Sequence, residues 1–157
     1  MLFQSILRVS IVTALFINLT ALANDRFTYS ADGAEVTDAT TGLIWRRCSE
    51  GQQFSFDRCE GKATEHNFKG AIANAKSHTK PESAWRVPNI NELSTLVEKR
   101  VRHPAIDTNV FPNTASNRYW SSTPHEMEST QAMIVYFTDG HATKYNQNNK
   151  AYVRLVR

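Results

Sequence analysis

The fold is decided by residues 84–93, which read Ala84-Trp85-Arg86-Val87-Pro88-Asn89-Ile90-Asn91-Glu92-Leu93. Val87 precedes a proline, which disfavours the helical conformation and keeps this residue extended. Asn89 is a favourable helix N-cap. Glu92 occupies the third helical position, where its carboxylate can accept a hydrogen bond from the N–H of the capping residue. The sequence therefore predicts an extended segment that turns sharply into a helix at Asn89.

The residues around this turn predict how it is held. We expect Trp85 to be buried in the core and Arg86 to form a hydrogen-bond hub beneath the helix cap. Lys99 and Arg100 suit the negative end of a helix dipole, so the helix is expected to continue to this point. Its apolar face is formed by Ile90, Leu93, Leu96 and Val97.

The N-terminus has the pattern of a signal peptide at residues 1–23. Arg8 provides a minimal positive region, residues 9–22 are mostly apolar, and Ala21-Leu22-Ala23 is a typical cleavage signal. The apolar segment is shorter than the roughly 20 residues that a membrane-spanning helix needs, so a retained anchor is the lesser alternative. We expect an exported protein, periplasmic or extracellular at the cell surface, with one domain at residues 24–157 and no stable membrane span after cleavage.

The net charge and the cysteine content further limit the kinds of protein that this chain can be. Without Arg8, 17 basic residues face 15 acidic ones, which is too small an excess to indicate nucleic-acid binding. Cys48 and Cys59 are the only cysteines, and an even pair in an exported chain indicates a disulfide. A redox or catalytic pair is the alternative, although the ten residues between them do not form a C-x-x-C motif.

Short strands dominate the remaining pattern. One helix is expected from about Asn67 to His78, because apolar residues recur there at helical spacing. Phe54 and Phe56 alternate within the loop after Cys48, which indicates either a strand or two aromatic anchors beneath the loop. Strands are expected at residues 27–30, 35–38, 43–46, 119–123, 132–137, 142–146 and 151–157, the last three forming an antiparallel meander.

The long segment from Val101 to Thr114 is expected to be a loop bounded by prolines. It is too long and too apolar for a solvated linker, so Ile106, Val110 and Phe111 should pin it to the body. Basic residues cluster at its start. They are explained either by the end of the preceding helix or by a ligand-binding role.

The order of several motifs resembles the Lcl C-terminal domain family, named after the C-terminal domain of a bacterial collagen-like surface protein. The resemblance covers roughly residues 27–157. It rests on Asp38 with Thr41-Gly42-Leu43-Ile44-Trp45, on Trp85-Arg86-Val87-Pro88-Asn89 with Glu92-Leu93, on Pro104-Ala105-Ile106-Asp107, on Tyr119-Trp120-Ser121-Ser122, and on Tyr152-Val153-Arg154-Leu155-Val156-Arg157.

The resemblance implies an α+β fold similar to C-type lectins and to the formylglycine-generating enzyme, in which two helices flank a small, irregular antiparallel sheet. For the named member it implies adhesion through acidic, sulfated glycans. This chain lacks the Gly-X-Y tract of a collagen-like stalk. It also lacks calcium ligands where calcium-dependent lectins have them, because Val87 precedes Pro88 and Ser121 follows Trp120. No cysteine follows Cys59, which argues against formylglycine-generating chemistry.

Motifs for catalysis or metal binding are not found in the sequence. The histidines lack zinc-ligand spacing, and no nucleophile elbow, P-loop or dinucleotide fingerprint occurs. We therefore assign no catalytic residue, metal ligand or cofactor. Asp107 and Asp139 could form an acid pair only if the fold brought them together, and turn or capping roles are the simpler interpretation.

The leading hypothesis is an exported, non-enzymatic binding or adhesion module for an acidic glycan or an envelope protein. The alternatives are a periplasmic hydrolase with scattered catalytic residues and an envelope structural protein. Arginine forks suit sulfate and carboxylate groups, and aromatic rings suit stacking. For the neighbours Arg46 and Arg47, one solvated side chain and one local salt bridge remain an alternative. The candidate ligand-binding residues are Arg46, Arg47, Arg100, Arg102, Tyr119, Lys144 and Tyr145.

Overall fold

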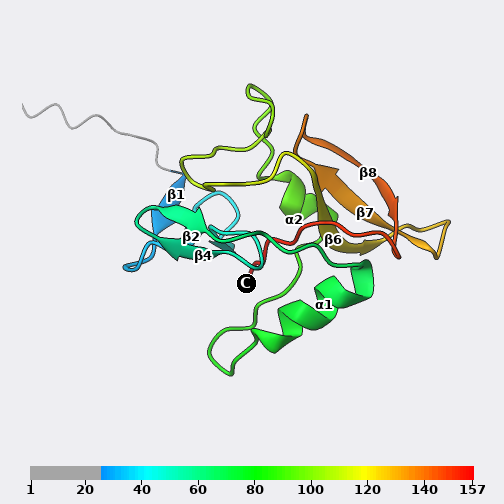
Figure 1. Cartoon of the computed structure of the whole chain (residues 1–157), viewed down its shortest axis with the longest axis horizontal. Coiled ribbons are helices and arrows are strands. Elements are labelled where there is room, and N and C mark those ends of the chain that lie inside the picture. The colour runs from blue at the N-terminus through cyan, green and yellow to red at the C-terminus, as the bar shows by residue number, and fades with distance from the viewer. Residues whose placement is uncertain (1–25) are drawn as a thin grey trace, which may run out of the picture.

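The computed structural model describes residues 26–157, which form three small antiparallel sheets and two short helices (Figure 1). Cys48 and Cys59 form a disulfide. The expected combination of small antiparallel sheets, two helices and one disulfide is thus confirmed. The signal peptide predicted at residues 1–23 lies outside the described residues. Within residues 26–157, no helix is long and apolar enough to cross a membrane.

The first sheet has the order β1-β2-β3 and is followed by a two-stranded hairpin. Its strands match the prediction, and Gly42 makes the tight β2–β3 turn with a φ of +73°. The hairpin of β4 and β5 carries Cys59, so the disulfide ties it to the residues after β3. The bounds are β1 Phe27–Tyr29, β2 Glu35–Asp38, β3 Ile44–Arg46, β4 Gln53–Ser55 and β5 Arg58–Glu60.

The third sheet has the order β6-β7-β8, with β6 at Arg118–Pro124, β7 at Gln131–Tyr136 and β8 at His141–Asn146. The β7–β8 hairpin turns at Asp139-Gly140 as predicted, and Tyr136 pairs with His141 at its end. Helix α1 (Phe68–Ser77) packs on one face of this sheet and α2 (Ile90–Ser94) on the other. The middle strand is therefore covered on both faces, as its apolar sequence indicates.

The organising turn forms as predicted, but its helix is short. The Asn89 side chain accepts from the Glu92 N–H, and the Glu92 carboxylate accepts from the Asn89 N–H. The predicted continuation to Arg100 is wrong, because α2 ends at the C-cap Thr95. Backbone bonds beyond it span three residues rather than four, and the N–H of Glu98 then bonds the carbonyl of Ala105. This bond directs the chain into the long loop.

The C-terminal segment does not extend the meander, so this prediction is wrong. Residues 151–157 instead run between the sheets, as Figure 1 shows in red. Tyr152 exchanges backbone bonds with β6, whereas Leu155 and Arg157 bond to β3. Alternate side chains serve two cores, since Val153 and Leu155 pack on the α1 side and Val156 packs on the α2 side. Joining two cores buries more apolar surface than an edge position beside β8 would.

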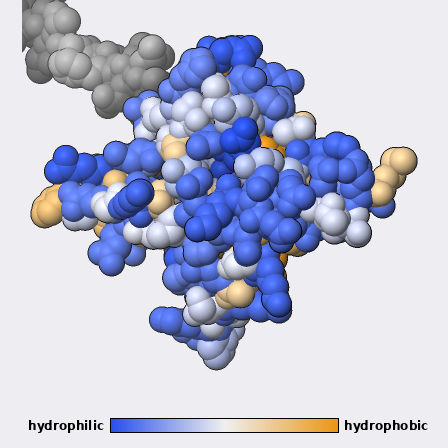
Figure 2. Space-filling model, turned by 45° about the vertical axis from the view of Figure 1, so that its right-hand side comes forward, coloured by the Kyte–Doolittle hydropathy of each residue, from blue (hydrophilic) through white to orange (hydrophobic). Residues whose placement is uncertain are grey.

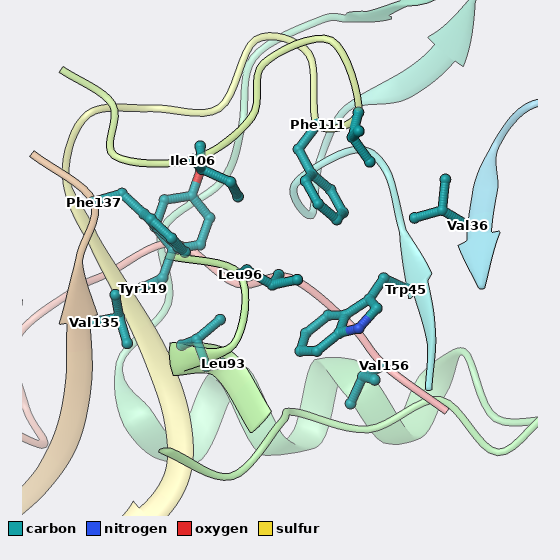
Figure 3. Packing of buried hydrophobic residues seen from close by; sticks show 11 residues of the cluster. Val36, Trp45, Leu93, Leu96, Ile106, Phe111, Tyr119, Val135, Phe137 and Val156 are labelled. Atoms are coloured by element: carbon teal, nitrogen blue, oxygen red, sulfur yellow. The ribbon is translucent and has the colours of Figure 1, made fainter. Parts of the chain in front are cut away.

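The larger core lies between the first and third sheets (Figure 3). Trp45 and Val36 from the first sheet belong to the same core cluster as Leu93 of α2 and Val135 of β7, and all four are fully buried. The long loop closes this core with Ile106, Val110 and Phe111, which are 1%, 6% and 1% exposed. Their predicted role as pins of this loop is confirmed.

Candidate anion-binding site

The side chain of Arg118 on β6 lies between two tyrosine rings. Its guanidinium carbon is 4.9 Å from the ring centroid of Tyr136 on β7 and 4.9 Å from that of Tyr145 on β8. Arg118 and Tyr136 are direct partners in the sheet, so they point to the same face. Because β7 is the middle strand, the arginine side chain reaches across it to Tyr145. Cation–π contact with both rings restricts the position of the guanidinium.

The donors of Arg118 have no partner within residues 26–157. The side chain makes no hydrogen bond and no ion pair there, although it is only partly exposed. A guanidinium presents several N–H donors in a rigid fork that matches a carboxylate or a sulfate. Arg118 therefore offers an oriented and unused anion-binding fork.

Further polar groups extend from this point around the end of the β7–β8 hairpin. The ring of His141 lies edge-on to Tyr136 at 5.5 Å, and its Nδ1 contacts the carboxylate of Asp139. The hydrogen bond from His141 holds the pKa of Asp139 below its usual value. Arg102 donates to the Asp139 carbonyl at 3.4 Å. These contacts define the Arg118 strip, which consists of Arg102, Arg118, Tyr136, His141 and Tyr145.

Of the residues singled out from the sequence, Tyr145 and Arg102 belong to this strip. Arg100 is exposed nearby in the same loop as Arg102. Lys144 pairs with Met133 across the sheet and so projects from the opposite face to Tyr145, where it forms an ion pair with Glu128. Lys144 is therefore separated from the strip by the sheet itself.

Arg47 and Tyr119 lie in the interior instead of on a binding surface. Arg47 is 5% exposed and donates to the carbonyls of Val110 at 2.8 Å, Gly33 at 2.8 Å and Asn109 at 3.0 Å. Tyr119 is fully buried, so its ring offers no stacking surface to a ligand. These two side chains tie the fold together and leave no group free for a ligand.

Arg46 belongs to a separate polar cluster at the end of β3. It forms an ion pair with Glu50 at 3.3 Å and stacks on Trp85 at 4.8 Å. Glu50 is 5% exposed, and its other carboxylate oxygen is 2.8 Å from Nε2 of His78, which caps the C-terminal end of α1. A cavity of about 220 Å³ adjoins Arg46 and Glu50. Arg46 thus fits the alternative of a local salt bridge.

Arg154 in the C-terminal segment is a buried arginine with several hydrogen-bond partners. It is fully buried, and its Nη1 donates to the carbonyls of Arg46 and Arg47 while its Nη2 donates to Thr114 at 2.7 Å. Its guanidinium lies 4.7 Å from the ring centroid of Phe111, and burial lowers its pKa to about 10. Arg154 joins three segments and is closed to solvent.

Arg118 and Tyr136 were missed in the sequence. The signal available was the alternation within each strand together with the β7–β8 turn, which sets His141 opposite Tyr136. The register of β6 could not be read in this way, since a bulge separates Trp120 from Pro124.

Among residues 26–157, no group of three or more His, Cys, Asp or Glu side chains could hold a metal ion.

The comparisons with known proteins agree with the motif order. Residues 34–157 match the model of the Lcl C-terminal domain. The chain belongs to the Lcl C-terminal domain family. No curated protein matches the chain. All residues of the Arg118 strip and both helices fall inside the matched Lcl C-terminal domain, whereas β1 precedes it.

Proposed function

We propose that this Lcl C-terminal domain is an exported, non-enzymatic binding module that adheres to acidic glycans through the Arg118 strip. The observation that carries the proposal is the arginine fork held between Tyr136 and Tyr145 with its donors unused among residues 26–157. A preorganised cation loses little side-chain freedom when it binds. The Arg118 guanidinium can therefore pair with an anionic ligand without first breaking a contact among residues 26–157.

Two further features belong to the proposal. We include a C-type-lectin-like arrangement, which the small sheets, the two helices on opposite faces of the third sheet and the long loop support. We also include export through the signal peptide at residues 1–23, to the periplasm or the cell surface. The disulfide supports export, because such bonds persist in oxidising compartments.

The test is binding of the purified protein to sulfated, carboxylated and neutral glycans at low and high salt. We expect binding to the acidic glycans only, weakened by salt. Arg118→Ala should reduce affinity about tenfold or more, because charge-assisted hydrogen bonds are lost. Arg118→Lys should recover part of it, since the charge remains without the fork.

Arg58→Ala is the matched control, because Arg58 is an exposed arginine paired with Glu60 on the β4–β5 hairpin. It should leave the affinity unchanged. An Arg118→Ala variant that binds normally would overturn the assignment of the site. If no glycan binds, the ligand is not a glycan and the envelope-partner or structural alternative takes its place.

A second candidate function is hydrolysis in the periplasm, favoured by the contact between His78 and Glu50. A histidine oriented by a buried carboxylate is a common arrangement for a general base. The adjoining Ser49 does not complete it, because its hydroxyl bonds Tyr119 in the core at 2.8 Å. Turnover of ester or glycoside substrates that disappears in His78→Asn would support this candidate, and an inactive wild-type protein would reject it.

A further inference from the structure

Two methionines and a histidine line one pocket beside the β6–β7 connection. Met127 and Met133 are the methionines of the chain other than Met1, and both belong to this pocket together with His125. The pocket measures about 320 Å³ and reaches the first residue of α2. Two thioether sulfurs and one imidazole ring therefore surround a single small volume.

The pairing of β6 with β7 explains why these residues lie together. The N–H of His125 donates to the carbonyl of Gln131 at 3.0 Å, so the connection begins directly beside β7. Ala132 packs on the α1 side of the sheet, and its neighbour Met133 therefore faces the α2 side, where the pocket lies. Met127 follows His125 by two residues within the connection. All three side chains thus lie at the same end of one hairpin.

One nitrogen of the histidine ring is left without a partner. Nδ1 of His125 is buried and makes no hydrogen bond among residues 26–157. A buried polar atom that lacks a partner costs free energy, and such atoms are rare in folded proteins. An imidazole nitrogen is a common metal ligand, so a metal ion in the pocket would supply the missing partner.

The pocket is open to solution through Met127, which is 89% exposed. The face in Figure 2 is mostly hydrophilic, with isolated hydrophobic side chains at its two lateral tips. Phe56 at the tip of the β4–β5 hairpin is likewise 89% exposed, so it is neither a strand residue nor an anchor beneath the loop. Met127 differs from Phe56 in carrying a sulfur on a flexible chain, which can close over an ion that enters the pocket.

The charge near the pocket suits a cation. Glu126 lines the pocket, is exposed, and forms no ion pair among residues 26–157. The ammonium of Lys144, on the same face of the sheet as Met133, is neutralised by its ion pair with Glu128. The unpaired carboxylate therefore raises the local concentration of cations beside the two thioethers.

We propose that His125, Met127 and Met133 form a binding site for one soft monovalent cation, Cu(I). Thioether sulfur is a soft and uncharged ligand that selects Cu(I), and imidazole also suits copper. Within the described residues no group of three His, Cys, Asp or Glu side chains could hold a metal ion, so a harder divalent cation lacks its usual ligands. The site lies on the opposite face of the sheet from the Arg118 strip, and the inference does not rest on glycan binding.

The cysteines do not compete with this site. The thiolate is the form of cysteine that binds metal ions. Cys48 and Cys59 are the only cysteines of the chain, and they are joined in a disulfide. Binding of a soft ion can therefore be assigned to the methionines and the histidines.

The test is titration of the purified, untagged chain with Ag(I), which has the charge and softness of Cu(I) and needs no reductant. Competition with a chromogenic chelator then measures the affinity for Cu(I) without oxygen. We expect one ion per chain and no comparable binding of Zn²⁺. Met127→Leu, Met133→Leu and His125→Leu should each weaken binding at least about tenfold, since even residues that only orient metal ligands contribute about 10–100-fold.

The matched control is His103→Asn, which removes an exposed histidine elsewhere. His103 has a φ of 59°, which Asn tolerates, so this variant should fold and bind as the wild type does. Leucine is close to methionine in volume, so the two methionine variants should keep the fold. Urea unfolding of each variant checks this point.

The methyl signals of methionine in NMR spectra give the decisive result on the wild type. Ag(I) should move the signals of Met127 and Met133 and leave that of Met1 in place. A wild type that binds neither Ag(I) nor Cu(I) would overturn the proposal, as would unchanged binding in the Met127→Leu/Met133→Leu double variant. Tighter binding of Zn²⁺ than of Ag(I) would exclude a thioether site.

Discussion

Two arginines of this domain each lie against two aromatic rings, but one holds the fold together and the other is available to a ligand. Arg47 is stacked between Tyr29 at 4.6 Å and Phe54 at 4.4 Å, and Arg118 between Tyr136 and Tyr145 at 4.9 Å each. The donors of Arg47 reach three backbone carbonyls. Those of Arg118 reach none among residues 26–157. A structural arginine therefore differs from one available to a ligand in the partners of its N–H donors and not in its contacts with aromatic rings.

The location of each sandwich explains the difference. Arg47 follows β3, where the long loop passes, and it donates to the carbonyl of Asn109 and to the buried carbonyl of Val110, which would otherwise lack a partner. Arg118 lies on a sheet whose neighbouring carbonyls are already paired by strand hydrogen bonds. Strand pairing occupies these backbone carbonyls, so the guanidinium of Arg118 remains free for a ligand.

The largest loss of stability is expected when Arg47 is replaced. Arg47→Ala should lower the free energy of unfolding by about 3 kcal/mol, because buried carbonyls lose charge-assisted hydrogen bonds and the sandwich loses its centre. Urea unfolding measures this change. Arg47→Lys keeps the charge but not the fork and should recover only part of the loss. A loss below that of an ordinary surface substitution would show that the two sandwiches do not differ as described.

The second prediction concerns the free energy of unfolding of a variant at Arg118. Arg118→Ala should lower the free energy of unfolding by only about 0.5–1 kcal/mol, since it removes stacking and no internal hydrogen bond. Thermal and urea unfolding beside Arg47→Ala give the comparison directly. If both variants unfolded equally easily, Arg118 would be a structural residue and the anion-binding proposal would lose its main support.

Local chemistry explains which parts of the fold could be predicted. The capping box of Asn89 and Glu92 depends on residues three apart, and the turn at Asp139-Gly140 depends on two neighbours, so both are visible in the sequence. The end of α2 depends on a bond from Glu98 to Ala105 across the loop, and residues 151–157 depend on partners far away in the chain. Neither contact leaves a local signal.

The candidate site was harder to predict than the fold for the same reason. Arg47 and Arg118 each stand near aromatic residues in the sequence, and the sequence does not say which arginine meets free carbonyls. The sequence indicates Tyr119 as a stacking residue, but strand alternation places it on the α2 side, where it is buried with Phe137. A binding residue is recognised by what its neighbours leave unused, which requires the tertiary structure.

A third arginine provides an intermediate case. Arg86 donates to both carboxylate oxygens of Glu92, at 2.7 and 2.8 Å, and this hydrogen bonding lowers the pKa of Glu92 from its ordinary 4.5. The folded protein therefore binds a proton at Glu92 less readily than the unfolded chain. The contribution of this ion pair to the free energy of unfolding is complete above pH 4.5. It is lost as the pH falls through the lowered pKa of Glu92 in the folded protein.

Glu92→Gln tests this case. Gln keeps an acceptor for the Asn89 N–H and loses the ion pair, so the variant should be less stable than the wild type by about 0.5–1 kcal/mol at neutral pH. The difference should shrink as the pH falls below 4.5, in urea unfolding series recorded at each pH. A difference that stays constant down to strongly acidic pH would assign the effect to packing instead of charge.

The smallest effects are expected at the charges around the strip, and they decide which face of the sheet binds. Arg102 lies at the end of the strip and is exposed, so Arg102→Ala should reduce acidic-glycan affinity about two- to fivefold and flatten its salt dependence. Lys144 projects from the opposite face and is neutralised by Glu128, so Lys144→Ala should leave the affinity unchanged. Titrations at two salt concentrations compare both variants. A loss in Lys144→Ala without a loss in Arg102→Ala would move the binding surface to the α2 side, where Arg118 does not reach.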